Sequence, residues 1–457
     1  HLRLGQAGQS IDQLSDPALR HFYSAHIPIY KFMATQSPVY LHELQENWGL
    51  TIDAIEDLPD ENKLKNVMLA ELYYKRAALE FLDGNYFTAL RFLQSSRSSI
   101  RRNEKKFPGN ENHLKVLGIF NVALGAVPRK YQWLTNILGF SGDMDLGMDQ
   151  LRRAAKTGHI LPLEADLFAY YVEKNMLDQP HKAIDRLTQL KKRYPTNLIV
   201  DLCLAAGYMS IKENEAALQL LRARNQYRLD QAVFFSPLWD YQLGKAFYFK
   251  EDYFRAQIYF EQFLKQKGSK LFRTDATFRL GMSLTLNGSY QEGLRFFRLL
   301  ASDKSSGFDD DAYAENMARR FARHEPSAHV KALFRARNLF DGGYYQQALA
   351  ILDGLASQAL NVADRTELAY RYARIYHSQG ALQRARQQYL LCIAQPQSEQ
   401  LWLQVYAHYF LGEIAREAGD FSTARSYYKS ALEFDDYFYQ DGLENRCKIA
   451  LSALKRQ

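Results

Sequence analysis

The sequence predicts an all-α fold in which antiparallel helix pairs stack into a solenoid. Three observations support this prediction. A small residue recurs twelve positions before a second small residue in several segments, and a turn containing Gly or Asn separates the two. No segment shows a convincing β-strand pattern. The composition is rich in aromatic residues, at 14%, which suits packing between neighbouring helices. Because two helices approach closely only where side chains are small, the repeated small residues mark helix crossings.

Five copies of this frame are well defined. A large residue four positions after the second small residue is expected to fill the groove beside the crossing. Each pair leaves one apolar side uncovered, so the pairs must stack on one another. The five pairs of small residues are Gly244 and Ala256, Gly281 and Gly293, Ala336 and Ala348, Ala373 and Ala385, and Gly412 and Ala424. Weaker copies, the second of which breaks the small-residue rule, are Ala77 and Ala89, Tyr171 and Ala183, and Ala205 and Ala217.

Length and composition limit the class of protein. The 457 residues, 47% of them hydrophobic, suit an elongated array or several domains better than one compact core. A net charge of +7 is mild for this length, and no basic run is dense enough to predict nucleic-acid binding. The three cysteines, Cys203, Cys392 and Cys447, form no CxxC pair, so zinc and redox sites are not expected. We therefore predict no cofactor.

One interval departs from the regular spacing. Gly118 and Gly147 are 29 residues apart, although they are the small residues of a single pair. The sequence predicts an insertion, residues 119–143, between the two helices of this pair. The second helix is expected to start near Asp145. A pattern of Gly-Phe-x-Gly-Asp-x-x-x-Gly runs from Gly139 to Gly147.

These motifs resemble known families. From about Asn66 to Leu432 the frame is similar to the tetratricopeptide repeat, which implies a right-handed superhelical solenoid that binds other proteins. The stretch from Leu114 to Ala155 is similar to the eukaryotic tetratricopeptide-39 and yeast inclusion-body-clearance proteins and their bacterial relatives. That resemblance implies an adaptor or a factor linked to lipid droplets.

The remaining segments complete the predicted organisation. We expect an N-terminal helical cap over residues 1–64 and an array that becomes regular over 65–325, with an extra helix at 309–323. A C-terminal array with a capping helix is expected over 326–457, and together these parts form one continuous solenoid. Within the cap, a helix that starts at Pro17 should end near Ala25, because Pro28 interrupts it.

The sequence offers little support for catalysis. The HExxH, GxSxG, Walker and strand-linked GxGxxG motifs are absent, so we predict that the chain is not an enzyme. Asp309, Asp310 and Asp311 could hold a divalent metal, but they lack the spacing and the glycine of a calcium loop. Their simpler role is to cap the extra helix. A metal-dependent enzyme at this acidic segment is therefore the least favoured hypothesis.

The candidate partner-binding residues follow from the repeat frame. Positions three before, one after and four after the first small residue should face the groove of a solenoid. Aromatic residues interleaved with cations favour a peptide or helix that carries acidic groups. An equally supported interpretation is that the aromatics pack between repeats and the cations solvate the groove. The predicted residues are Phe168, Tyr241, Lys245, Tyr248, Phe278, Arg337, Tyr370, Arg374, His377, Tyr409 and Arg416.

Two function hypotheses of different kinds follow. The favoured one is a non-catalytic scaffold or adaptor that binds partner segments in its groove. The alternative is an accessory subunit of an envelope- or membrane-associated assembly, in which the insertion contacts a membrane or membrane protein. The first residue is His1 rather than Met, which slightly favours an exported or periplasmic protein whose leader is removed. No run of about 18 apolar residues predicts a transmembrane helix.

Overall fold

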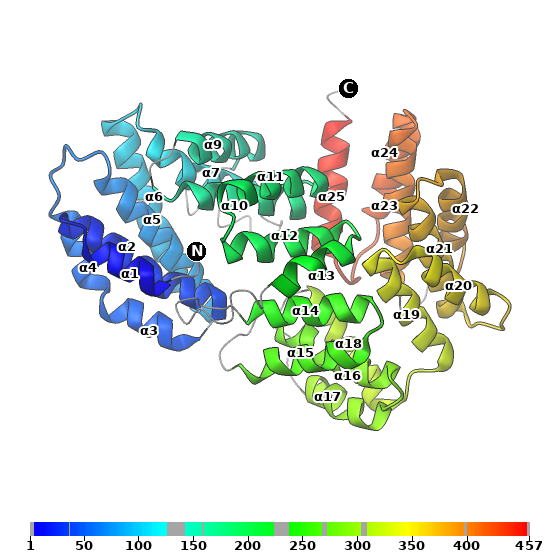
Figure 1. The fold of residues 1–457 in the computed structure, drawn as a ribbon. Helices are drawn as coiled ribbons and strands as arrows, with labels where there is room; N and C mark the ends of the chain where they lie inside the picture. The colour runs from blue at the N-terminus through cyan, green and yellow to red at the C-terminus, as the bar shows by residue number, and fades with distance from the viewer. Residues whose placement is uncertain are drawn as a thin grey trace. The chain divides into compact units, whose positions relative to one another are not determined.

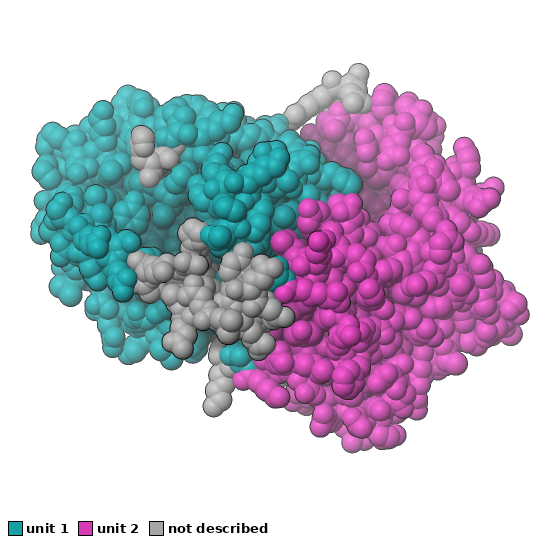
Figure 2. Space-filling model, in the orientation of Figure 1, with its two compact units in different colours: residues 1–204, 223–239, 266–270 teal, residues 205–222, 240–265, 271–457 magenta. Residues whose placement is uncertain are grey.

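The computed structural model describes residues 4–35, 37–125, 142–157, 160–223, 237–266, 272–302, 309–396 and 400–454. These residues form helices and turns and contain no β-strand, so the predicted all-α fold class is confirmed (Figure 1). The chain divides into two compact units, coloured separately in Figure 2. Unit 1 contains residues 1–204, 223–239 and 266–270, and unit 2 contains residues 205–222, 240–265 and 271–457.

The helices follow one another closely along the chain. Those that lie wholly in unit 1 are α1 (Leu4–Asp12), α2 (Pro17–Thr35), α3 (Pro38–Glu46), α4 (Trp48–Glu56), α5 (Lys65–Asp83), α6 (Tyr86–Lys106), the short 3-10 helix η1 (Glu111–His113), α7 (Leu114–Gly125), α9 (Met144–Thr157), α10 (Pro162–Asn175) and α11 (Pro180–Arg193). The divisions between the units fall within α12 (Leu198–Ser210) and α14 (Leu238–Phe249). Those that lie wholly in unit 2 are α13 (Asn214–Arg222), α15 (Tyr253–Lys265), α16 (Arg273–Leu286), α17 (Tyr290–Ser302), α18 (Asp309–Arg323), α19 (Ala328–Gly342), α20 (Tyr345–Ala356), α21 (Val362–Ser378), α22 (Leu382–Ile393), α23 (Leu401–Glu417), α24 (Phe421–Ala431) and α25 (Gln440–Ala453).

The helices pack in pairs at the predicted small residues. A Cβ atom added at Gly244 would lie 2.7 Å from the ring of Phe260, and one at Gly281 would lie 2.8 Å from the ring of Phe297. Each of these aromatic residues lies four positions after the second small residue of its pair. The predicted tetratricopeptide-type crossing is therefore present, and the aromatic ring occupies the space that a larger residue would need.

The pair with the unusual spacing crosses in the same way. A Cβ atom at Gly118 would lie 2.8 Å from Leu151, and one at Gly147 would lie 2.8 Å from Val122. These two glycines thus bring α7 against α9 although they are far apart in sequence. Helix α7 continues to Gly125, so the first part of the expected insertion is helical. Residues 126–141, which form most of it, lie outside the described residues.

The turns between the paired helices share one backbone feature. The residue seven positions after the first small residue has a positive φ in every copy of the frame, with Gly in five copies. In seven of the eight copies the next amide donates to a carbonyl five residues earlier, as Asn85 does to Glu80 at 2.8 Å and Ser289 to Leu284 at 2.8 Å, whereas Gln179 donates to Glu173, six residues earlier. This pattern satisfies the last carbonyls of the first helix. The positive-φ residues are Gly84, Asp178, Lys212, Glu251, Gly288, Gly343, Gly380 and Gly419.

Helix α2 differs from its prediction. It continues through Pro28 to Thr35, so the expectation that it ends near Ala25 is wrong. A proline inside a helix costs about 3 kcal/mol, because it removes a backbone hydrogen bond and crowds the preceding turn. Pro28 is buried, and the adjacent Ile29 and nearby Phe32 lie in the core with exposed fractions of 0% and 2%. Burial of this apolar face against α3, α4 and α5 offsets the cost.

Helix α18 occupies the residues expected for the extra helix. It packs on both α16 and α17. The Phe321 ring lies 5.6 Å from that of Phe297, 5.8 Å from that of Phe334 and 6.4 Å from that of Phe278, measured between centroids. Helix α18 therefore adds Phe321 to an aromatic core that α16, α17 and α19 share.

Two turns that are distant in sequence meet in unit 2. The Lys212 ammonium, between α12 and α13, lies 3.0 Å from the Asp341 carboxylate near the end of α19. The Tyr344 hydroxyl, at the start of α20, donates to Glu215 at 2.7 Å and accepts from Asn214 at 3.1 Å. These contacts hold two non-consecutive repeats of unit 2 together.

Unit 1 encloses a network of buried charges. The Lys75 ammonium lies 2.7 Å from a Glu164 oxygen, and the Lys115 ammonium lies 2.8 Å from the other. Lys115 also lies 2.9 Å from Glu71, which is fully buried, and the Tyr30 hydroxyl donates to Glu164 at 2.5 Å. Burial alone would raise the pKa of Glu164, but the two lysines hold that pKa well below its ordinary value. Two positive and two negative charges thus compensate one another inside unit 1.

Candidate functional site

The structure places every predicted groove residue on the first helix of a pair. They are Phe168 on α10; Tyr241, Lys245 and Tyr248 on α14; Phe278 on α16; Arg337 on α19; Tyr370, Arg374 and His377 on α21; and Tyr409 and Arg416 on α23. Phe168 belongs to unit 1 and the others to unit 2.

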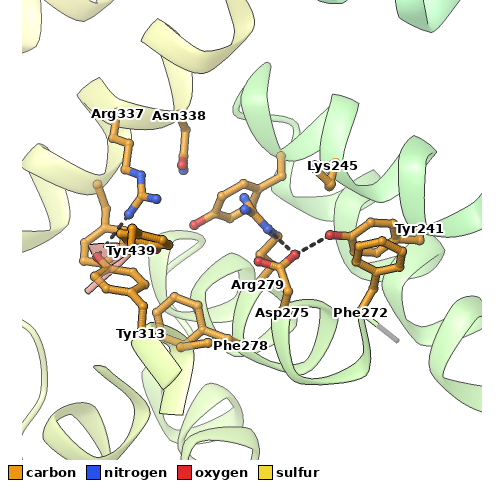
Figure 3. Close-up of a pocket in the computed structure, with 13 residues that line it drawn as sticks. Tyr241, Lys245, Phe272, Asp275, Phe278, Arg279, Tyr313, Arg337, Asn338 and Tyr439 are labelled. Carbon is orange, nitrogen blue, oxygen red and sulfur yellow. Dashed lines mark hydrogen bonds and ion pairs between the residues drawn. The ribbon is translucent and has the colours of Figure 1, made fainter. Parts of the chain in front are cut away.

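Five of these residues line one pocket in unit 2 (Figure 3). Helices α14, α16, α18 and α19 form its walls, together with Tyr439 just before α25. Its volume is about 130 Å³. The predicted residues in the lining are Tyr241, Lys245, Tyr248, Phe278 and Arg337, and the others are Phe272, Asp275, Arg279, Tyr313, Ala314, Phe334, Asn338 and Tyr439.

Asp275 is the one carboxylate among the described lining residues. It accepts hydrogen bonds from the Tyr241 hydroxyl and from Arg279 Nε, each at 2.7 Å, and Figure 3 shows these two groups on opposite sides of it. Burial alone would raise the pKa of Asp275, but Arg279, with Lys245 and Tyr241, holds that pKa below its ordinary value. Asp275 therefore stays ionised and orients Arg279 within the pocket.

Arg337 supplies a cation on another wall. Its Nη1 donates to the Tyr313 hydroxyl at 3.0 Å, and its Nε lies 3.9 Å from the Asp341 carboxylate. Burial alone would lower the pKa of Arg337, but Tyr313, Tyr439 and Asp341 hold it above its ordinary value. Asp341 is shared with Lys212, so the pocket is linked to the contact between the two distant turns.

Aromatic rings cover much of the remaining lining. Tyr241 stacks on Phe272 with ring centroids 4.8 Å apart. The Arg279 guanidinium lies 5.3 Å from the centroid of Tyr248, and the Lys245 ammonium lies 5.5 Å from that of Tyr241. Burial raises the pKa of Tyr248 to about 12, so this phenol remains a neutral hydrogen-bonding group. The cations are thus held beside aromatic faces, where cation–π attraction stabilises them.

The charge of the lining favours an anion. Among the described lining residues, Lys245, Arg279 and Arg337 carry three positive charges against the single negative charge of Asp275. All four side chains are partly exposed, so a solute can reach them. The arrangement can bind an anionic group by charge-assisted hydrogen bonds.

Several lining residues were not predicted from the sequence. Arg279 and Asn338 each lie one position after a residue that the repeat frame selects. A separate signal could have identified Asp275 and Arg279, because a spacing of four residues predicts an ion pair on one helix face. Tyr313 and Tyr439 come from α18 and from the segment before α25, which are not part of the repeats. No signal in the repeat frame could have identified these two residues.

Three further predicted residues lie in an aromatic cluster between α21 and α23. The Arg374 guanidinium lies 3.9 Å from the Phe410 ring centroid, and the His377 ring lies 5.7 Å from the same ring. Tyr370 packs against Tyr389 at 6.2 Å. Burial, with the nearby Arg374, lowers the pKa of His377 to about 4. These residues pack between neighbouring repeats, and their role toward a partner stays a prediction.

The other three predicted residues are also separate from the pocket. Tyr409 is buried, with an exposed fraction of 4%. Arg416 forms an ion pair of 2.7 Å with Glu413. In unit 1, Phe168 contacts Tyr74 edge to face at 6.5 Å.

The described residues contain no group of three or more His, Cys, Asp or Glu side chains placed to hold a metal ion. Asp311 is buried at the start of α18, whereas the side chains of Asp309 and Asp310 lie outside the described set. Within the described ranges, none of the helices combines the length and the apolar character needed to cross a bilayer.

Comparison with known proteins gives two similarities. Residues 114–306 match the model of the Iml2/tetratricopeptide repeat protein 39 family, so the chain resembles that family over this range. Among solved structures, the chain is similar to one described as the crystal structure of the APC/C hetero-tetramer Cut9–Hcn1. The identity is 12%, the match covers 98% of this chain and 86% of that chain, and the TM-score is 0.26. No curated protein matches the chain.

Proposed function

Given the resemblance of residues 114–306 to the Iml2/tetratricopeptide repeat protein 39 family, we propose that the chain is a non-catalytic scaffold that binds partner proteins. In this proposal, a partner segment with acidic groups contacts the first-helix faces of unit 2 at the pocket between α14, α16, α18 and α19. Helix-pair repeats commonly present such extended surfaces to partners.

The observation that carries the proposal is the uneven charge of the pocket. Lys245, Arg279 and Arg337 come from three different first helices and converge on one aromatic-lined space. Asp275 is the one negative charge among the described lining residues and binds Arg279, and Asp341 approaches Arg337 at 3.9 Å. An acidic group from a partner would add a further counter-charge to the three cations, and a lining with a positive excess also steers acidic partners toward it.

Affinity purification with a charge reversal tests this proposal. Lys245→Glu changes a half-buried cation of the pocket, whereas Arg386→Glu makes the same change on the exposed face of α22. We expect at least one partner to be retained by the wild type and by Arg386→Glu, and to be depleted about tenfold or more by Lys245→Glu, because a tenfold loss corresponds to only about 1.4 kcal/mol. Circular dichroism should show that both variants keep the helical content of the wild type.

Unchanged partner capture by Lys245→Glu would contradict the proposal. If the Lys245→Glu protein retains the same partners in the same amounts as the wild type, the pocket is not the contact surface and the proposal is wrong.

A further inference from the structure

We infer that the unit 2 pocket binds a single carboxylate carried on a short hydrocarbon stem, such as the side chain of a glutamate. This inference rests on the proposed function, because it concerns the same site, and it names the group that the site recognises. The same chemistry occurs in a glutamate of a partner protein and in a small free organic acid.

The size of the pocket limits the ligand to one such group. Its volume is about 130 Å³. A cavity of about 150 Å³ lined by apolar side chains accommodates one benzene molecule. The pocket therefore admits one side chain or one small acid, and the rest of a peptide must lie outside it.

The charged groups favour a planar anion. Arg337 and Arg279 present guanidinium groups, whose forked geometry matches the two oxygens of a carboxylate. The Asp275 carboxylate holds Arg279 through its Nε at 2.7 Å, and Tyr313 holds Arg337 through its Nη1 at 3.0 Å. Both cations are thus positioned before a ligand binds, which reduces the entropy lost on binding.

The apolar lining distinguishes a carboxylate on a stem from an inorganic anion. Phe278 and Phe334 belong to the lining with exposed fractions of 5% and 6%, and Tyr241 and Tyr248 add their rings. A phosphate ion has no apolar surface to cover these rings, whereas the methylene groups of a glutamate side chain do. Burial of those methylene groups adds hydrophobic stabilisation to the ionic contacts.

The pocket has an accessible edge. Phe272 lies at the start of α16, lines the pocket and has an exposed fraction of 40%. Its ring stacks on that of Tyr241, which donates to Asp275. A ligand that enters here passes an aromatic surface before it reaches the cations.

Isothermal titration of the purified full chain tests the inference with three probes. They are butyrate, the blocked peptide acetyl-Gly-Glu-Gly-amide and inorganic phosphate. We expect saturable binding of butyrate or the blocked peptide, at least tenfold tighter than that of phosphate. Tighter binding of the blocked peptide identifies a partner side chain as the source, whereas binding of butyrate alone identifies a small free acid.

Two variants and one control locate the binding. Ala314→Leu fills the pocket, because Ala314 lines it and has an exposed fraction of only 2%. Arg337→Gln removes a cation and keeps a shorter polar side chain, so it serves if the filled variant does not fold. Each should weaken binding tenfold or more, and Arg386→Gln, on an exposed face of α22, should leave it unchanged.

Three outcomes overturn the inference: neither carboxylate binds, phosphate binds as tightly as they do, or Arg337→Gln and Arg386→Gln bind butyrate equally. If the carboxylates fail while partner capture still depends on Lys245, this inference is wrong and the scaffold proposal stands. If a carboxylate binds in the pocket but no partner depends on Lys245, the inference stands and the scaffold proposal is wrong.

Discussion

Gly343 lies directly against the backbone carbonyl of Lys212 in unit 2. A Cβ atom at Gly343 would lie 1.9 Å from the Lys212 carbonyl oxygen, and the φ of Gly343 is +82°. The nearby ion pair between Lys212 and Asp341 lies in the same contact, and Asp341 also approaches Arg337 of the pocket. The contact between two distant turns therefore supports the wall that holds this cation.

Gly343→Ala should destabilise unit 2 strongly. Gly380 has the same place in its turn and a φ of +73°, but no atom lies within 4 Å of its added Cβ. Gly380→Ala should therefore cost only the strain of a left-handed residue, about 1–2 kcal/mol. Gly343→Ala should cost about 1–3 kcal/mol more, because its Cβ meets backbone. Urea unfolding followed by circular dichroism measures both, and equal losses would show that the turns do not meet as described.

The crossing glycines give a second prediction. Gly281→Ala places a Cβ 2.8 Å from the Phe297 ring and should destabilise the protein by about 1–2 kcal/mol. Gly354, in α20, has open space around its added Cβ, so Gly354→Ala should stabilise the helix by about 0.5–1 kcal/mol. Adding Phe297→Leu to Gly281→Ala should recover part of the loss. Additive effects of these two substitutions in a double-mutant cycle would contradict the packing.

The buried charges of unit 1 give a third prediction. Glu164→Gln leaves the buried Lys75 and Lys115 with one fewer counter-charge and should cost about 3–5 kcal/mol. Glu111 forms a partly exposed pair with Arg153 at 2.7 Å, and Glu111→Gln should change stability very little. Thermal unfolding compares the two variants. A small loss for Glu164→Gln would mean that the network is not compensated as described.

The buried side chain of His26 should make the unfolding free energy depend on pH. Burial, together with Lys75, lowers the pKa of His26 to about 3, whereas histidine in the unfolded chain binds this proton with its ordinary pKa of 6.5. The contribution of neutral His26 to the unfolding free energy is therefore fully present above pH 6.5. It is lost by roughly 1.4 kcal/mol per pH unit as the pH decreases toward 3. We expect His26→Leu to flatten the dependence of the unfolding free energy between pH 6.5 and 4.5. Parallel curves for the wild type and the variant would show that His26 does not titrate in this way.

The repeat frame predicted the crossings because close helix packing requires small residues at a fixed spacing. Gly244 and Gly281 show this directly, since their neighbours Phe260 and Phe297 leave no room for a side chain. The same reasoning identified the paired helices α7 and α9 despite their unusual separation. It could not show that Pro28 lies inside α2, because the burial that offsets the proline depends on tertiary contacts.

The pocket was predicted only in part for a similar reason. The frame selects residues by their place on one helix face, so it found Tyr241 and Lys245. It could not reveal that α18 and the segment before α25 supply Tyr313 and Tyr439, because these segments have no counterpart in the repeat. Convergence of distant segments depends on how the repeats pack in unit 2, which the spacing alone does not define.

Photo-crosslinking at the edge of the pocket tests the central claim most directly. A photoreactive phenylalanine analogue placed at Phe272, which is 40% exposed and lines the pocket, should capture a partner protein. The same analogue at Phe254, which is 66% exposed on α15 and does not belong to the pocket lining, is the matched control. We predict that the crosslinked partner appears at position 272 and is lost when Lys245→Glu is added. Capture at position 254 alone, or equal capture at both positions, would contradict the account.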